Sequence, residues 1–541
     1  MAHFTPMPYD SAMIPVGRGL TYRRIRMAWM GVFCLSLVSC PISFAGDPGN
    51  PVDSTIHRPV LFFTNPDMQQ LLGRTFSDAL VNLLDTNTVP FDKAVYNQTG
   101  LLTDPPGEFI RAGGGYSQPW TRDASLNSWN AASLLEPAVA RNTLWSVVRR
   151  QPDGTLVIQQ DNQWWDKVVW ICAAWNHYAI TGDREFLVAA YETAGESLRE
   201  MTRLHYNRSY HLFEGPSFFN DGIAAYPVPP ATANEDKGSF VLSYPGTDKL
   251  MALSTNALYY LAYRSTARMG ATLGKGGNEV ASFAAIADTL RREINRHFWI
   301  PANGLYGYFI HQGDSLAGKL DSSEEGAGLS FAILFGIADS LAARSIVQKA
   351  HIAPHGIVDV YPSFARYSET NPGRHNEIIW PMVQGFWVEA TARLDAESAF
   401  AEGLTSFARL VRSSGGDFYE IYNAGSGDVD GGWQTGKHWD SQPHQTWSAT
   451  AYLRSVFSGL FGMRFSPEGV EFHPLLPFGW GDVELSGLRY RNMMLTIVLR
   501  GSGHVVSSFS LDGQEERRAE VPASLAGDHR LVITMSEGAS R

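Results

Sequence analysis

The spacing of hydrophobic residues changes once along this chain of 541 residues, and this change constrains the fold more than any other feature. Up to about residue 465, hydrophobic residues recur at intervals of three and four, as in the segment 283–299, FAAIADTLRREINRHFW. One face of a helix through this segment carries Phe283, Ile286, Ala287, Leu290, Ile294, His297 and Phe298. This interval is typical of amphipathic helices.

From residue 466 onward the interval becomes two. In MLTIVLRG, residues 494–501, the side chains of Leu495, Ile497 and Leu499 alternate with those of Thr496, Val498 and Arg500. Such alternation is typical of strands with one buried face, and the Asp–Gly pair that ends SFSLDG is a turn signal. We therefore predict a mainly α protein, with a helical domain over residues 61–465 and a small C-terminal β-sandwich over residues 466–541.

The N-terminus has the pattern of an export signal. Four arginines between residues 18 and 26 precede the apolar run MAWMGVFCLSLVSC, which is too short to remain as a membrane span. The sequence LVSC resembles a bacterial lipobox, which would acylate Cys40, whereas SFA at residues 43–45 fits an ordinary signal-peptidase site. We expect a signal peptide over 1–45, a Pro/Gly/Asp-rich linker over 46–60, and a periplasmic or membrane-anchored lipoprotein, with secretion as the alternative.

The charge of the exported part argues against several partners. Removal of residues 1–45 leaves 39 basic and 53 acidic side chains, a formal net charge of −14. An acidic chain with no basic run is poorly suited to bind nucleic acid, and we expect membrane contact only through a lipid anchor at Cys40. No HExxH, paired CxxC or Gly-x-Ser-x-Gly motif occurs, so we expect neither a metal nor another cofactor.

Six segments between the helical stretches combine tryptophan, carboxylates and glycine. They are QPWTRDAS (118–125), QQDNQWWD (159–166), FEGPSFFNDGIAAYP (213–227), DSSEEGAG (321–328), GRHNEIIWP (373–381) and DFYEIYNAGSG (417–427). Their spacing is compatible with helical hairpins arranged in a ring, which would bring all six segments to one rim. Cleavage of a glycosidic bond needs two carboxyl groups from different segments, together with groups that hold the sugar.

The order and spacing of these segments resemble the (α/α)6-barrel glycoside hydrolases, the six-hairpin glycosidases that include glucoamylases, trehalases and processing α-glucosidases. The resemblance covers roughly residues 60–510 as scattered segments and implies an (α/α)6 toroid. WTRD matches the glucoamylase WTRD, which implies that Trp120 stacks on the terminal sugar while Arg122 and Asp123 bind its hydroxyls. Such a clamp implies exo action. Asp123 as the acid, or a purely structural helix start, are the alternatives.

The catalytic carboxylates follow from two further resemblances. FEGPSFFNDG is similar to the trehalase segment that supplies the general acid, which implies that role for Asp221. This segment departs from the family pattern, because Glu214 lies seven residues upstream instead of four and Asn220 replaces a tryptophan. Glu214 and Glu325 therefore stay as alternatives. FYEIYNAGSG followed by HQTWSATAYL resembles the glucoamylase segment that carries the base, which implies that role for Glu420.

Together with the N-terminal export signal, these resemblances imply an exported, exo-acting, inverting glycoside hydrolase that releases terminal α-linked sugars from oligosaccharides. Inversion requires room for a water, so we expect the carboxyl groups of Asp221 and Glu420 to lie roughly 6.5–9.5 Å apart. Trp164, Trp380 and Trp433 either line the sugar cleft or pack in the core.

Two other functions remain open. The segment 467–491 resembles the end of the glycoside phosphorylases of the same clan, and Lys437, His438 and His444 are the basic residues near the base that could hold phosphate. The second alternative is a lipoprotein that binds sugars without catalysis.

Overall fold

The computed structural model describes residues 58–90, 107–159, 163, 165–227, 238–368 and 370–538. Residues Ile56–Arg541 form one compact unit. The predicted signal peptide, Cys40, most of the predicted linker and Trp164 lie outside the described residues. Among the described residues, no helix has the length and apolar character needed to cross a bilayer.

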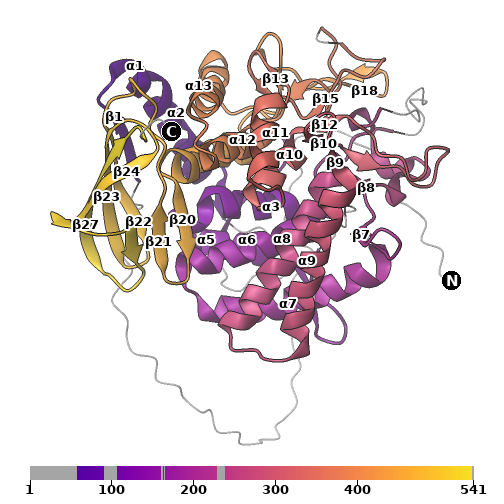
Figure 1. Cartoon of the computed structure of the whole chain (residues 1–541), viewed down its shortest axis with the longest axis horizontal. Helices are drawn as coiled ribbons and strands as arrows, with labels where there is room; N and C mark the ends of the chain where they lie inside the picture. The colour runs from indigo at the N-terminus through magenta and orange to yellow at the C-terminus, as the bar shows by residue number, and fades with distance from the viewer. Residues whose placement is uncertain are drawn as a thin grey trace, which may run out of the picture. The chain divides into compact units, whose positions relative to one another are not determined.

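Helices dominate the chain between residues 66 and 460, as the sequence predicts (Figure 1). They are α1 (Pro66–Met68), α2 (Arg74–Leu80), α3 (Thr121–Asn127), α4 (Ser133–Leu135), α5 (Pro137–Ser146), α6 (Asp166–Thr181), α7 (Arg184–His205), α8 (Leu253–Thr272), α9 (Asn278–Phe298), α10 (Gly326–Leu334), α11 (Ser340–Lys349), α12 (Pro381–Arg393), α13 (Glu397–Ser413) and α14 (Thr446–Arg454). Short π-helical turns extend α2, α3 and α14.

From α6 onward, helices that are buried along most of their length alternate with helices that bury one face. Helix α12 is buried from Pro381 to Ala392, and α10 is buried from Gly326 to Ile333. Helix α9 buries one face only, and that face includes Phe283, Ala287, Leu290, Ile294 and Phe298. The helix predicted in this segment is therefore confirmed up to Phe298, whereas Trp299 begins the strand β9 (Trp299–Ile300).

The buried helices contact one another in a closed cycle. Within the described part of the chain, α3 packs against α6, α6 against α8, α8 against α10, α10 against α12, α12 against α14, and α14 against α3. Each amphipathic helix packs against a buried neighbour, as α9 does against α8 and α13 against α12. The loops that connect these helices therefore meet around the ends of a common set of buried helices.

The chain after Leu460 forms strands, and the predicted change of interval is confirmed there. A six-stranded sheet has the order β1 (Val60–Phe63), β22 (Val483–Tyr490), β23 (Met493–Gly501), β27 (Gly527–Ser536), β24 (Val505–Leu511) and β25 (Gln514–Glu515). Strands β23 and β27 are parallel and the other neighbours are antiparallel. A three-stranded sheet has the order β20 (Met463–Ser466), β21 (Gly469–Phe472) and β26 (Glu520–Pro522).

The strands share a hydrophobic core with neighbouring helices. Leu495, Ile497 and Leu499 of β23 are buried as predicted, in a cluster that also contains Phe457 near the end of α14. Strand β1 comes from the N-terminal side of the helices and was not predicted, because its four residues are too few to show a period. The division into a helical domain and a separate β-sandwich stays a prediction.

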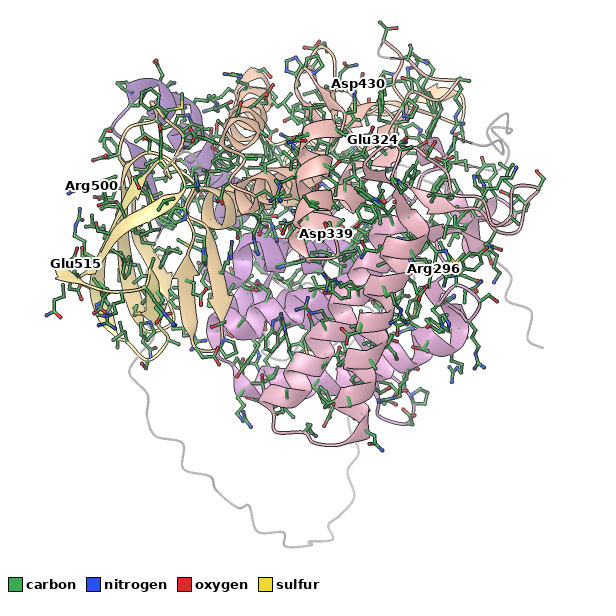
Figure 2. All side chains as sticks on the ribbon, in the orientation of Figure 1. Arg296, Glu324, Asp339, Asp430, Arg500 and Glu515 are labelled. Carbon is green, nitrogen blue, oxygen red and sulfur yellow. The ribbon has the colours of Figure 1, made fainter. Side chains whose placement is uncertain are left out.

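Short strand pairs tie the loops between helices together. β16 (Ile378–Ile379) pairs with β17 (Tyr422–Asn423), and β12 (Glu324–Glu325) pairs with β15 (Val360–Tyr361). Figure 2 shows Glu324, in β12, and Asp430 in the upper part of the view, and Arg500 and Glu515 on strands of the six-stranded sheet. These pairs join three of the carboxylate-bearing segments to other loops.

Candidate active site

Two adjacent residues contact the two carboxylates predicted to act as acid and base. The Nη2 atom of Arg374 donates to Oε2 of Glu420 at 2.7 Å, and Nε2 of His375 lies 3.7 Å from Oδ1 of Asp221. Adjacent Cα atoms lie about 3.8 Å apart, so one dipeptide reaches both carboxylates. The structure therefore brings the segments 213–227, 373–381 and 417–427 together.

The segment WTRD joins the same cluster through Arg122. Its Nη1 atom donates to Asp166 at 2.9 Å and to Oε1 of Gln163 at 2.6 Å, while Nη2 lies 3.4 Å from Oδ2 of Asp221. Gln163 in turn donates from Nε2 to Oδ2 of Asp221 at 2.8 Å. Arg122 thus connects three of the predicted segments.

Trp120 and Asp123 lie at the start of α3. Trp120 occupies the N-cap position and is half-buried, whereas Asp123 is buried in the first turn, where a negative charge is favoured by the helix dipole. Of the three roles stated for this turn, the sugar clamp and the helix start are compatible with this placement.

Tyr116 belongs to the site, although it was not predicted. The carboxylate of Glu420 raises its pKa, burial adds to the effect, and the charges of Asp221 and Asp123 raise the pKa further. The phenol is therefore a neutral donor near all three carboxylates. The run of three glycines before Tyr116 was the available signal, because Gly113 packs its backbone against the loop that enters α14.

Arg374, also missed in the sequence, fixes the predicted base. Glu420 is 4% exposed, so its charge needs a buried partner. The guanidinium of Arg374 also donates to the backbone oxygens of Gly431 and Asp440 at 3.1 and 3.3 Å. The Cζ atom of this guanidinium lies 5.5 Å from the ring centroid of Trp380. Glu420 is also held through its backbone nitrogen, which donates to the backbone oxygen of Gln442.

Asp123, one candidate for the acid, is 3% exposed, and exposure also separates the three others. The side chain of Asp221 is 33% exposed, whereas Glu325 is fully buried and accepts hydrogen bonds from Ser217 and from the Ser254 backbone. Glu214 pairs with Lys249 at 3.2 Å. Of the three, Asp221 is the carboxyl group that both reaches solvent and lies beside the Arg374–His375 pair.

The backbone before Asp221 is held in an unusual conformation. Phe219 has φ 55°, which is rare for a residue with a side chain. Its ring packs against Trp380 and Trp447 at centroid distances of 5.3 and 6.5 Å. The backbone oxygen of Asp221 accepts from Val241 at 2.6 Å, so packing and hydrogen bonds together set the direction of the loop.

The tryptophans predicted to line a cleft divide into different groups. Trp380 is 3% exposed and donates from Nε1 to the backbone oxygen of Arg374 at 2.8 Å. It packs beneath the site, and this burial favours the core-packing alternative stated for Trp380. Trp433 is half-buried in β18 (Trp433–Gln434), next to the loop that carries Asp221, and Trp164 lies outside the described residues.

The basic residues considered for phosphate have protein partners. His438 lies 2.7 Å from Asp430, His444 lies 2.9 Å from Asp417, and the Lys437 ammonium lies 4.4 Å from the ring centroid of Trp439. Within the described ranges, no group of three or more His, Cys, Asp or Glu residues could hold a metal ion.

No protein-family model matches the sequence, and no curated protein matches it. Among solved structures, the chain is similar to a sialidase with a TM-score of 0.60 at 14% identity, over 83% of this chain and 39% of that one. It is similar to a family GH78 rhamnosidase of a Bacillus species with a TM-score of 0.53 at 14% identity, over 82% of this chain and 42% of that one.

A third structure matches along its whole length. This is the family GH63 mannosylglycerate hydrolase of Thermus thermophilus in complex with Tris and D-glycerate, with a TM-score of 0.51 at 15% identity, over 71% of this chain and 100% of that one. The chain spans about two fifths of the length of the sialidase and the rhamnosidase. At these identities the likeness concerns the fold alone, and this chain has a fold that occurs in glycoside hydrolases.

Proposed function

We propose that this chain is a glycoside hydrolase that releases the terminal sugar of an oligosaccharide with inversion, in which Asp221 is the general acid and Glu420 the general base. The observation that carries the proposal is the Arg374–His375 pair, whose two adjacent side chains each contact one of these carboxylates from separate loops. The shared fold with glycoside hydrolases supports the same interpretation. The closed cycle of buried helices supports an (α/α)6 toroid.

The proposed reaction uses one proton transfer at each carboxyl group. Asp221 gives its proton to the glycosidic oxygen as the bond to the anomeric carbon breaks. Glu420 takes a proton from a water that attacks the opposite face of that carbon. The donors around Asp221, Gln163 and Arg122, stabilise the carboxylate that remains after its proton has left.

The remaining residues would hold the sugar. In this proposal Trp120 stacks on the terminal ring, Asp123 and Tyr116 meet its hydroxyls, and Trp433 borders the leaving group. Terminal α-linked sugars as the substrate, exo action, and export with Cys40 as an acylation site belong to the same proposal and rest on the sequence resemblance.

The direct test is a screen of purified protein, residues 46–541, against assorted oligosaccharides, with mass spectrometry to detect released sugar and NMR to identify the anomer formed first. We expect Asp221→Asn and Glu420→Gln to lower kcat at least about 100-fold, which is a typical share for general acid–base catalysis. Glu214→Gln, at the carboxylate paired with Lys249, serves as the control and should keep most activity.

Three outcomes would contradict the proposal. Hydrolysis at the wild-type rate by the Asp221 or Glu420 variant would remove that residue from its role. Turnover that requires phosphate would show a phosphorylase. Sugar-dependent tryptophan fluorescence without any product would show a binding protein.

A further inference from the structure

His375 lies between two carboxyl groups in the interior of the site. Its ring is 1% exposed, with Nε2 3.7 Å from Oδ1 of Asp221 and Nδ1 3.3 Å from Oδ2 of Asp359. The ring stacks on Trp380 at a centroid distance of 4.8 Å and an interplanar angle of 14°. The ring centroid of Phe219 lies 5.8 Å from that of His375. These contacts fix the ring plane, so each nitrogen faces one carboxyl group.

Asp359 is fixed in place by contacts with Ile378 and Asn220. It is fully buried, its backbone nitrogen donates to Ile378 at 3.0 Å, and its Oδ1 atom lies 3.4 Å from Nδ2 of Asn220. Burial raises the pKa of Asp359 well above its ordinary value, and the nearby Glu325 raises it further. The raised pKa favours the protonated form of Asp359, which can donate a hydrogen bond.

The imidazole is neutral as well. Burial lowers the pKa of His375 well below its ordinary value, and the cations Arg374 and Arg122 lower it further. A neutral imidazole carries one proton, on the nitrogen opposite the one that accepts a hydrogen bond. If Asp359 donates to Nδ1, the ring proton is on Nε2 and faces Asp221.

We propose that His375, oriented by Asp359, is a positioning residue for Asp221, which it supports through an Nε2–H directed at Oδ1. This inference rests on the proposed function, in which Asp221 is the acid. When Asp221 loses its proton to the leaving group, negative charge appears on Oδ1, and a preorganised donor there lowers the energy of the transition state more than that of the ground state. No proton moves onto the imidazole in this step.

The separation of 3.7 Å is longer than a hydrogen bond, and catalytic hydrogen bonds often shorten only when substrate binds. The opposite oxygen, Oδ2, already accepts from Gln163 and lies beside Arg122. His375 thus completes a set of donors around both oxygens of Asp221. Arg374, from the same loop as His375, is a second cation nearby, and it is engaged with Glu420.

The test compares two variants on two substrates. His375→Leu removes the donor, whereas His375→Gln retains a side-chain N–H at a similar reach. The substrates are the oligosaccharide that the wild type cleaves and the corresponding glycosyl fluoride, whose leaving group departs without protonation. A residue that supports the acid should matter only for the first substrate.

We expect His375→Leu to lower kcat on the oligosaccharide roughly 10- to 100-fold with little change in KM. This loss is smaller than the full contribution of general acid catalysis, because Asp221 itself remains. The kcat of this variant on the fluoride should stay within about threefold of the wild type, and His375→Gln should recover most of the lost rate. Equal losses on both substrates, or no loss on either, would overturn the inference. A wild type with no hydrolytic activity would overturn it together with the proposed function.

A second measurement does not depend on activity. In ¹⁵N NMR of the histidine rings, assigned by comparison with His375→Leu, the wild type should show the Nε2–H tautomer. Asp359→Asn keeps a donor toward Nδ1 and should preserve this tautomer, whereas Asp359→Ala should give a mixture. An active wild type whose His375 tautomer is the same in Asp359→Ala would overturn the orienting role of Asp359 and leave the proposed function intact.

Discussion

At the scale of single residues, burial gives similar carboxyl groups different properties. The side chain of Asp221 is 33% exposed and lies among donors. Glu325 has no contact with solvent, and burial raises its pKa to about 7. Its two oxygens accept hydrogen bonds from Ser217 and Ser254, which oppose the shift without cancelling it. Glu325 is therefore a site of pH-dependent stability, whatever its part in catalysis.

The pKa of Glu325 predicts the direction of that dependence. The unfolded chain releases this proton near pH 4.5 and the folded chain near pH 7, so the unfolded state binds fewer protons between these values. Stability should fall as pH rises from about 4.5 to about 7, by about 3 kcal/mol for this group, and stay lowered above pH 7.

Urea unfolding at a series of pH values measures this contribution. Glu325→Gln should be the more stable protein at pH 8 and should lack the fall between pH 4.5 and 7. Glu402→Gln, at an exposed position of α13, is the matched control and should follow the wild type. An identical pH profile for wild type and Glu325→Gln would contradict the assignment.

At the scale of elements, the site depends on loops that hold one another. β16 and β17 pair the loop of Arg374 with the loop of Glu420. The loop of Asp221 is set between β18 and the loop of His375, with the side chain of Gln434 accepting from the backbone of Ala224. Gly222 lies where the loop of Asp221 comes close to His375 and Gln434. A Cβ atom at this position would lie 2.9 Å from Cδ2 of His375 and would overlap Oε1 of Gln434.

Gly222→Ala should therefore displace the loop that carries Asp221. The φ angle of Gly222 is −90°, which alanine adopts without strain, so the effect is purely steric. A displacement of about 1 Å at a catalytic group lowers kcat on the order of 100-fold. Steady-state kinetics on the screened substrate gives the measurement, with Gly276→Ala as control because open space surrounds that glycine. Unchanged kcat in Gly222→Ala would show that the close approach does not position Asp221.

At the scale of the whole molecule, the strands of the six-stranded sheet pack in the same hydrophobic cluster as several helices. β1 precedes the first helix in sequence and pairs with β22, so the beginning and the end of the described chain meet in one sheet. Its side chains alternate strictly: Leu61 and Phe63 are each 1% exposed, while Val60 and Phe62 are more than half exposed. The ring of Phe63 meets that of Trp480 at a centroid distance of 6.3 Å.

Substitution of two adjacent phenylalanines therefore tests whether β1 packs in this core. Phe63→Ala should lower the free energy of unfolding by about 3–5 kcal/mol, the usual cost of emptying a buried aromatic site. Phe62→Ala, the neighbour on the exposed face, should stay within about 0.5 kcal/mol of the wild type. Tryptophan fluorescence during urea unfolding should show one transition for strands and helices together. Equal effects of the two substitutions would mean that β1 is not seated as described.

The sequence by itself determined what depends on neighbours along the chain. The intervals of three and four around Phe283 and Leu290 specify an amphipathic helix, and the interval of two around Leu495 and Ile497 specifies a strand, because each pattern places apolar side chains on one face of the local structure. The carboxylate-bearing loops were also visible, with Asp221 and Glu420 among their residues.

Only the tertiary structure decided which of these residues meet and which are buried. Arg374 and Glu420 are 46 positions apart, His375 and Asp359 are 16 apart, and Tyr116 comes from a third region. Trp380 and Trp433 look alike in sequence, yet one is buried beneath the site and the other reaches its border. Periodicity reports only the face on which a side chain lies, whereas charge pairing and desolvation depend on the groups that the folded chain brings within a few ångströms.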